Sequence, residues 1–166
     1  YGISGSTEKI RCDCVGLMND VAKMVNGMCR KRGVTVNYII QKKEAFIVAD
    51  RIRLYQVFIN IIKNSIEAME YSEYKTLTIS LDISDQTVSI VVEDTGLGMD
   101  NDEFYNFQKD GFTKGKKGVH MGIGLSVVNR IVSDHDGHLF FNQKSENGML
   151  CKIQFPLSRE LIEVKT

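Results

Sequence analysis

The sequence has no long apolar run, no excess of charge of either sign and only one proline. Its 21 Lys and Arg residues balance 21 Asp and Glu residues, which excludes the overall basic surface that is typical of nucleic-acid-binding proteins. No apolar stretch approaches the roughly 18 residues that cross a bilayer, and the N-terminus lacks the charged and apolar regions of a signal peptide. We therefore predict a soluble domain that contacts neither nucleic acid nor membrane.

Cysteine and histidine are sparse and form no metal-binding pattern. No Cys-x-x-Cys pair is present, and Cys12 and Cys14 are too close together for an easy disulfide between them. The histidines show no convergent ligand spacing, so we expect no structural metal, and we interpret the cysteines as reduced thiols of a cytoplasmic protein. The residues concerned are Cys12, Cys14, Cys29, Cys151, His120, His135 and His138.

The composition that remains is that of a globular protein. Hydrophobic residues make up 43% of the chain and charged residues 25%, and 166 residues suit one domain better than two. We expect this domain to cover residues 1–157, and residues 158–166 to form a C-terminal tail after Pro156 closes the last strand.

Hydrophobic periodicity predicts three long helices separated by strands. Gly33 is a suitable helix stop, Asp50 a suitable N-cap, and Asn147-Gly148 a suitable hairpin turn. The expected elements are strand 7–14, helix 15–31, strands 34–40 and 45–48, helix 51–69, strands 77–83 and 87–93, a loop at 94–121 with one short helix at 103–107, helix 122–133, and strands 138–143 and 150–155.

This order of elements is not the strict alternation of a doubly wound fold. It predicts an α+β domain built as a two-layer sandwich, with a mixed, mostly antiparallel sheet and three main helices on one face. The long loop at 94–121 has no clear periodicity, and we expect it to be mobile and functional.

Two asparagines lie four residues apart on the second predicted helix. Asn60 and Asn64 therefore project from one face, one turn apart, and can serve a single pocket. An amide oxygen is a suitable ligand for Mg2+, and an amide N–H can donate to a phosphate. The alternative is that both side chains face solvent on an amphipathic helix.

An acid followed by glycines ends an apolar predicted strand. In segment 94–98 (DTGLG), Asp94 stands at the strand end, and Gly96 and Gly98 allow the backbone to approach a ligand. A carboxylate at this place can accept a hydrogen bond from an exocyclic amine such as that of adenine. The alternative is a tight turn capped by Asp94.

A second glycine-rich segment, 122–126 (GIGLS), opens the third long helix. Free backbone N–H groups and the positive end of the helix dipole favour phosphate there, although the segment can also be a flexible helix entry. A Rossmann motif is excluded because no strand directly precedes the glycines, and the Walker pattern is absent. The preceding lysines either form a solvated face or neutralise phosphate charge; they are Lys109, Lys114, Lys116 and Lys117, around Phe112.

Taken in order, four segments resemble the motifs of the histidine kinase branch of the superfamily that also contains the gyrase, Hsp90 and MutL ATPases. Segment 56–68 (QVFINIIKNSIEA) is similar to the N-box and 94–98 (DTGLG) to the first G-box. Segment 111–114 (GFTK) is similar to the F-box and 122–125 (GIGL) to the second G-box. The resemblance covers essentially residues 10–155 and implies the Bergerat-type form of the sandwich.

The resemblance implies an ATP site with Mg2+. Asn64 would ligate Mg2+ at the phosphates with support from Asn60, Asp94 would bind the adenine amine, and residues 98–121 would form an ATP lid. The residues implied in catalysis are Asn60, Lys63, Asn64 and Lys114. Those implied in nucleotide binding are Asn60, Asn64, Asp94, Gly96, Gly98, Met99, Phe112, Thr113, Lys114, Gly122, Ile123, Gly124 and Leu125.

Three positions qualify the resemblance. Gyrase-like ATPases have an acid at the position of Asn60 as the base for water, whereas an amide cannot take up a proton, so Asn60 favours phosphoryl transfer over hydrolysis. His120 stands where the second G-box often has a further glycine. Glu67 stands where related kinases commonly have a basic residue, so that Lys63 or Lys114 would contact phosphate instead.

None of the three histidines lies in a phosphoacceptor motif. We therefore expect the catalytic domain of a two-component sensor histidine kinase, which transfers the γ-phosphoryl group of ATP to a histidine on an upstream dimerisation domain outside this chain. A response regulator would act downstream. We expect the isolated domain to be a monomer and the parent protein to be a homodimer. The alternatives are a degenerate nucleotide-binding or interaction module, an ATPase, or a protein-serine kinase of the same superfamily.

Overall fold

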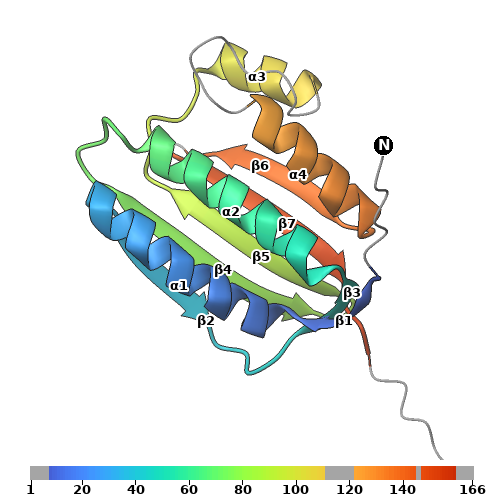
Figure 1. The fold of residues 1–166 in the computed structure, drawn as a ribbon. Coiled ribbons are helices and arrows are strands. Elements are labelled where there is room, and N and C mark those ends of the chain that lie inside the picture. Colours follow the sequence, from blue (N-terminus) through green and yellow to red (C-terminus); the bar gives the residue numbers. More distant parts are fainter. Residues whose placement is uncertain (1–7, 111–121, 145–146, 160–166) are drawn as a thin grey trace, which may run out of the picture.

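The computed structural model describes residues 8–110, 122–144 and 147–159. Helices α1, α2 and α4 lie side by side on one face of a five-stranded sheet (Figure 1), which confirms the predicted two-layer α+β fold. The helices are α1 (Cys14–Arg32), α2 (Arg51–Ala68), α3 (Asn101–Lys109) and α4 (Gly122–Asp134). The strands are β1 (Ile10–Asp13), β2 (Thr35–Ile40), β3 (Phe46–Ala49), β4 (Thr76–Ser84), β5 (Thr87–Asp94), β6 (His138–Gln143) and β7 (Met149–Pro156).

The main sheet is mixed and mostly antiparallel, as predicted. Its strand order is β2-β4-β5-β7-β6; β2 and β4 pair in parallel, and the other neighbours are antiparallel. The predicted hairpins β4–β5 and β6–β7 are both present. Strands β1 and β3 form a separate antiparallel pair, which the sequence did not indicate because side-chain alternation predicts a strand but not its partner.

The first two long helices are bounded by the expected residues. Asp50 caps α2, since its Oδ1 accepts from the N–H groups of Ile52 (3.0 Å) and Arg53 (3.2 Å). Gly33 follows α1 with φ 68°, a left-handed conformation that favours glycine. Asp13 is the N-cap of α1, so β1 ends one residue earlier than predicted. None of the helices in the described residues is long and apolar enough to cross a membrane.

The short helix predicted after β5 is present as α3 and is longer than expected. The Asp100 carboxylate accepts from the N–H of Glu103 (2.8 Å), and the Glu103 carboxylate accepts from the N–H of Asp100 (3.3 Å). This reciprocal capping box starts the helix two residues before the predicted position. Residues 111–121, which include Phe112, Thr113, Lys114 and His120, lie outside the described residues.

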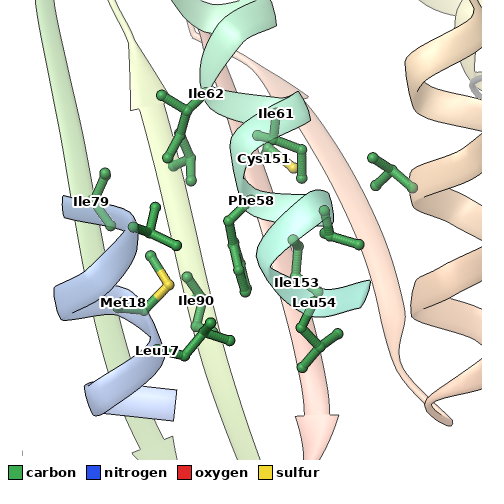
Figure 2. Close-up of a cluster of buried hydrophobic side chains, with 14 of the residues drawn as sticks. Leu17, Met18, Leu54, Phe58, Ile61, Ile62, Ile79, Ile90, Cys151 and Ile153 are labelled. Atoms are coloured by element: carbon green, nitrogen blue, oxygen red, sulfur yellow. The ribbon is translucent and has the colours of Figure 1, made fainter. Parts of the chain in front are cut away.

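The core lies between the three helices and the sheet. Figure 2 shows side chains of α1 and α2, among them Met18 and Phe58, packed with those of the sheet. Along β5 every second residue is buried: Val88, Ile90, Val92 and Asp94. Because side chains alternate between the two faces of a strand, the charged Asp94 points to the helix side at the end of β5.

His135, which follows α4, is a structural residue. It is buried, its Nε2 accepts from the N–H of Asp50 (3.0 Å), and its Nδ1 lies 2.7 Å from the carbonyl oxygen of Ile131. Because Nε2 accepts, Nδ1 carries the proton and donates. The ring therefore links the end of α4 to the start of α2 and uses both nitrogens in doing so.

Candidate functional site

The structure contains a cavity of about 310 Å³. Its lining residues come from helices α2, α3 and α4, from strands β5, β6 and β7, and from the segments that follow α2 and β5. Its walls are mostly apolar, with a few polar side chains, which is the usual form of a small-molecule site. Five of the predicted site residues line this cavity: Asn64, Asp94, Gly98, Met99 and Leu125.

Asp94 is held in one orientation by several donors. It is 4% exposed, and its Oδ1 accepts from the N–H groups of Gly96 (2.9 Å) and Met149 (3.2 Å), while the Ser65 hydroxyl also donates to the carboxylate. Burial raises the pKa of the Asp94 carboxyl, and these hydrogen bonds and the charge of Lys144 oppose the rise. A buried, oriented acceptor of this kind can recognise an amine N–H.

The backbone after Asp94 lies against the end of α2. The N–H of Leu97 donates to the carbonyl oxygen of Ala68 (3.2 Å). A Cβ on Gly96 would stand 2.8 Å from that oxygen and 2.9 Å from Oδ1 of Asp94, which is closer than van der Waals contact permits. The close approach that Gly96 allows is therefore between this segment and α2.

Gly148 is a site residue that the sequence did not indicate. A Cβ on Gly148, where φ is 103°, would stand 2.2 Å from the carbonyl oxygen of Asp94. The next residue, Met149, donates its N–H to the Asp94 carboxylate and also lines the cavity. Segment 147–148 is visible in the sequence as a turn signal, but only the pairing of β5 with β7 brings it to Asp94.

Asn64, on α2, is one of the residues that line the cavity. Its Nδ2 is buried and has no hydrogen-bond partner within the part of the chain that the structure describes. A buried amide without a partner costs about 1–3 kcal/mol, which a bound ligand can recover. A half-turn about the terminal torsion exchanges the two amide atoms, so Asn64 can offer a donor to a phosphate or an oxygen to a cation.

Helix α4 begins at Gly122, and its first turn leads to Leu125 in the cavity wall. Among the described residues, a Cβ on Gly124 would meet no atom within 4 Å apart from its chain neighbours and its own helix backbone, so packing of these residues does not require glycine at this position. The absence of a side chain leaves the helix N-terminus open to a ligand, and the helix dipole favours an anion there.

A family model described as histidine kinase-, DNA gyrase B- and HSP90-like ATPase matches residues 49–159, the part of the chain from α2 to β7 that forms the cavity. The chain belongs to this family. It is a histidine kinase-type ATPase catalytic domain, and membership of an ATPase family implies that it binds ATP.

Relatives among known proteins agree with the histidine kinase branch. The domain is 26% identical over 157 residues to sensor protein FixL of Bradyrhizobium diazoefficiens, covering 94% of this chain and 31% of FixL. It is 32% identical over 148 residues to sporulation kinase C of Bacillus subtilis, covering 86% of this chain and 34% of the relative. The chain thus spans about a third of the length of these two relatives.

The nucleotide-free catalytic domain of histidine kinase ThkA superposes with a TM-score of 0.77 at 22% identity, covering 90% of this chain and 96% of that chain, which confirms the fold. ThkA has also been solved in complex with response regulator protein TrrA. That structure superposes with a TM-score of 0.74 at 21% identity and covers 90% of this chain and 42% of that chain.

Asn60 and Lys63 are predicted site residues of this histidine kinase-type domain that do not line the cavity. Asn60 is half-buried and Lys63 is exposed, both on α2. Gly122 and Ile123 belong to the first turn of α4, while Phe112, Thr113 and Lys114 fall in the segment outside the described residues. The roles of all these residues stay predictions.

The cavity also contains residues that the sequence did not predict as site residues. Apolar side chains come from alternate positions of β5 and β7 and from α2 and β6, and acidic and aromatic side chains lie on α2, on the turn after it and on α3. They are Ile61, Ser65, Glu67, Ala68, Glu70, Tyr71, Val92, Leu97, Glu103, Phe141, Met149 and Cys151. Burial raises the pKa of the Cys151 thiol, with the Asp94 charge adding to the rise, so this thiol stays protonated.

The side chains of the cavity fit a Mg2+ ion that is held mainly by the ligand and by water. Among the described residues, no group of three or more His, Cys, Asp or Glu side chains can hold a metal ion. Magnesium in phosphate-transfer sites is commonly held by one or two protein oxygens together with substrate phosphates and waters. The amide of Asn64, whose Nδ2 has no partner among the described residues, fits such a site, whereas these residues form no all-protein cage.

Proposed function

We propose that this domain binds ATP with Mg2+ and transfers the γ-phosphoryl group to a histidine on a separate dimerisation domain of the same protein. One observation carries the proposal: the buried Asp94 carboxylate and the side-chain amide of Asn64, whose Nδ2 has no partner among the described residues, belong to residues that line the same apolar cavity. The first suits the amine of adenine, and the second suits the phosphate end of the nucleotide.

Positioning and charge neutralisation supply most of the catalysis in phosphoryl transfer. Asp94 would accept from the adenine amine, and the backbone N–H groups at the start of α4, from Gly122 to Leu125, would donate to the phosphates. Asn64 would hold Mg2+, which supplies neutralisation of the phosphate charge when it is bound. The apolar side chains of Leu125 and Met149 would exclude water from the space beside the adenine ring.

Asn60 favours transfer over hydrolysis. It lies one turn before Asn64 on α2, and an amide cannot take a proton from an attacking water molecule at neutral pH. We propose that Asn60 supports Asn64, and that Lys63 and Lys114 contribute positive charge near the phosphates. The nucleophile and its base would come from outside this chain.

The acceptor histidine belongs to another domain in this proposal. His135 is buried with both ring nitrogens in use, and His138 lies on β6 beside Phe140, with 6.3 Å between ring centroids. We propose an upstream dimerisation domain as the phosphoryl acceptor and a response regulator as the next partner, the class of protein with which ThkA was solved. The working location would be the cytoplasm.

Calorimetric binding of a non-hydrolysable ATP analogue, with and without Mg2+, tests the site. We expect Asp94→Asn and Asn64→Ala each to weaken binding by about tenfold or more, because each removes a specific contact. Removal of Mg2+ should weaken binding of the analogue to the parent domain, and it should cause little further loss of affinity in Asn64→Ala. The matched controls are Asp82→Asn on β4 and Asn26→Ala on α1, both exposed, which should bind as the parent does. Equal binding by all five proteins would contradict the assignment.

Transfer is tested by adding the dimerisation domain of the parent protein and γ-labelled ATP to this domain. The expected result is acid-labile label on a histidine of the added domain, with slower release of free phosphate. Rapid phosphate release without labelling would favour an ATPase, and label on a serine would favour a protein-serine kinase. Tight nucleotide binding with neither product would favour a nucleotide-binding module.

A further inference from the structure

Tyr71 is one of the residues that line the cavity, and it is nevertheless mostly exposed. Tyr71 lies in the turn after α2, and 82% of its surface is accessible. Ring contacts join other aromatic side chains, such as Phe107 and Phe141, but within the described residues none involves Tyr71. A large, partly apolar ring at the mouth of an apolar cavity is favourably covered by a flat ligand.

The turn that carries Tyr71 is fixed on both sides. The Lys75 ammonium donates to the carbonyl oxygen of Glu70 (2.8 Å), and the Thr95 hydroxyl donates to the carbonyl oxygen of Tyr74 (2.6 Å). Thr95 belongs to the segment after β5 that forms another part of the cavity wall. The backbone of the turn is therefore tied to that wall, and side-chain rotation is the main freedom left to the Tyr71 ring.

Two further residues line the cavity with Tyr71. Ala68 precedes Tyr71 by about one helical turn and lines the cavity with only a methyl group. Leu97 lines the cavity from the segment after β5 and is itself exposed. A purine whose amine reaches Asp94 would extend past Ala68 toward the mouth, where Tyr71 and Leu97 stand.

We infer that Tyr71 is a nucleotide-contacting residue whose ring stacks on the purine at the mouth of the cavity. The inference rests on the proposed ATP site and adds to it a residue that lies outside the four motifs. Stacking of an aromatic side chain on a base contributes about 5- to 100-fold in affinity, because every base presents a π face.

Calorimetric titration with ADP tests this role. Tyr71→Ala should raise the Kd about 5- to 100-fold, and Tyr71→Phe, which keeps the ring, should stay within about twofold of the parent. Tyr74→Ala is the matched control, since Tyr74 is 74% exposed but does not line the cavity, and it should also bind normally. The thermal midpoints of all variants should match the parent, because the substituted rings are exposed.

Fluorescence gives a second readout, because the chain contains no tryptophan. ADP should quench or shift the emission of a Tyr71→Trp variant and leave that of Tyr74→Trp unchanged. The inference is overturned by the following result. ADP binds the parent and binds Asp94→Asn more weakly, but Tyr71→Ala binds ADP as tightly as the parent and ADP does not change the emission of Tyr71→Trp. Failure of the proposed site itself looks different: Asp94→Asn and Asn64→Ala then bind ADP as tightly as the parent.

Discussion

Gly148 lies so close to Asp94 that a Cβ at position 148 would stand 2.2 Å from the Asp94 carbonyl oxygen. The two residues are joined by the antiparallel pairing of β5 with β7, in which Glu93 is opposite Leu150. The orientation of the buried Asp94 carboxylate therefore depends on a turn in the last hairpin, because the N–H of the following Met149 donates to that carboxylate.

Gly148→Ala should damage both stability and binding. The added methyl group must displace the Asp94 backbone and also meets a φ of 103°, so we expect the free energy of unfolding to fall by about 1–3 kcal/mol. Urea denaturation measures this loss, and calorimetry should show weaker ADP binding. Gly27→Ala is the control, since Gly27 is exposed on α1 and a methyl group there would meet none of the described residues beyond its own helix within 4 Å. This variant should be neutral or stabilising by up to about 1 kcal/mol. A Gly148→Ala protein as stable as the parent would refute the close packing.

Gly124→Ala should separate binding from stability. Within the described part of the chain, nothing outside its own helix lies within 4 Å of a Cβ at this position, so the first turn of α4 should accept the methyl group and gain up to about 1 kcal/mol of stability. If phosphates approach the N-terminus of α4, the same methyl group should weaken binding of an ATP analogue. Thermal unfolding and calorimetry on one protein sample measure both effects. Unchanged affinity would place the phosphates elsewhere.

Asp94→Asn should bind nucleotide poorly without losing stability. Burial raises the folded-state pKa of Asp94 above its ordinary value of 3.8, so the folded protein holds this proton more tightly than the unfolded chain does. The contribution of Asp94 to stability is therefore fully present below the unfolded pKa and is lost as pH rises through the folded pKa. Asparagine keeps an accepting oxygen for Gly96 and Met149 without the buried charge.

The free energy of unfolding of Asp94→Asn at about pH 7 should accordingly equal or exceed that of the parent. The difference should narrow as pH falls toward the folded pKa of Asp94. Urea denaturation at a series of pH values measures it. A variant that is less stable than the parent at neutral pH, by an amount that shrinks in acid, would show that the carboxylate charge stabilises the fold.

His135→Ala should destabilise the fold without removing the site. It leaves the N–H of Asp50 buried without its acceptor and empties space in the core, so we expect a loss of about 2–3 kcal/mol. His138→Ala, on the exposed face of β6, should change stability by less than about 0.5 kcal/mol. Both variants should bind ADP normally when folded, as measured by calorimetry below the unfolding temperature. Equal stability of the two variants would contradict the linking role of His135.

The elements and the layered arrangement could be predicted because they depend on residues close together in the chain. The 3.6-residue period of α2, the cap at Asp50 and the stop at Gly33 are all present in the structure. So is the alternation of β5 that turns Asp94 toward the helices. The order of four short motifs led to the family that the comparison with known families confirmed. The roles of Phe112, Thr113 and Lys114 stay predictions.

The sequence by itself determined the helices and strands, their inner faces and the family. Only the tertiary structure decided which distant residues surround Asp94: Ser65 from α2, and Gly148 and Met149 from the turn and start of β7. The physical reason is that alternation gives each strand an inner face but does not name its neighbour. The lining of the cavity, including Tyr71 at its mouth, exists only once β7 lies between β5 and β6 and α2 covers them.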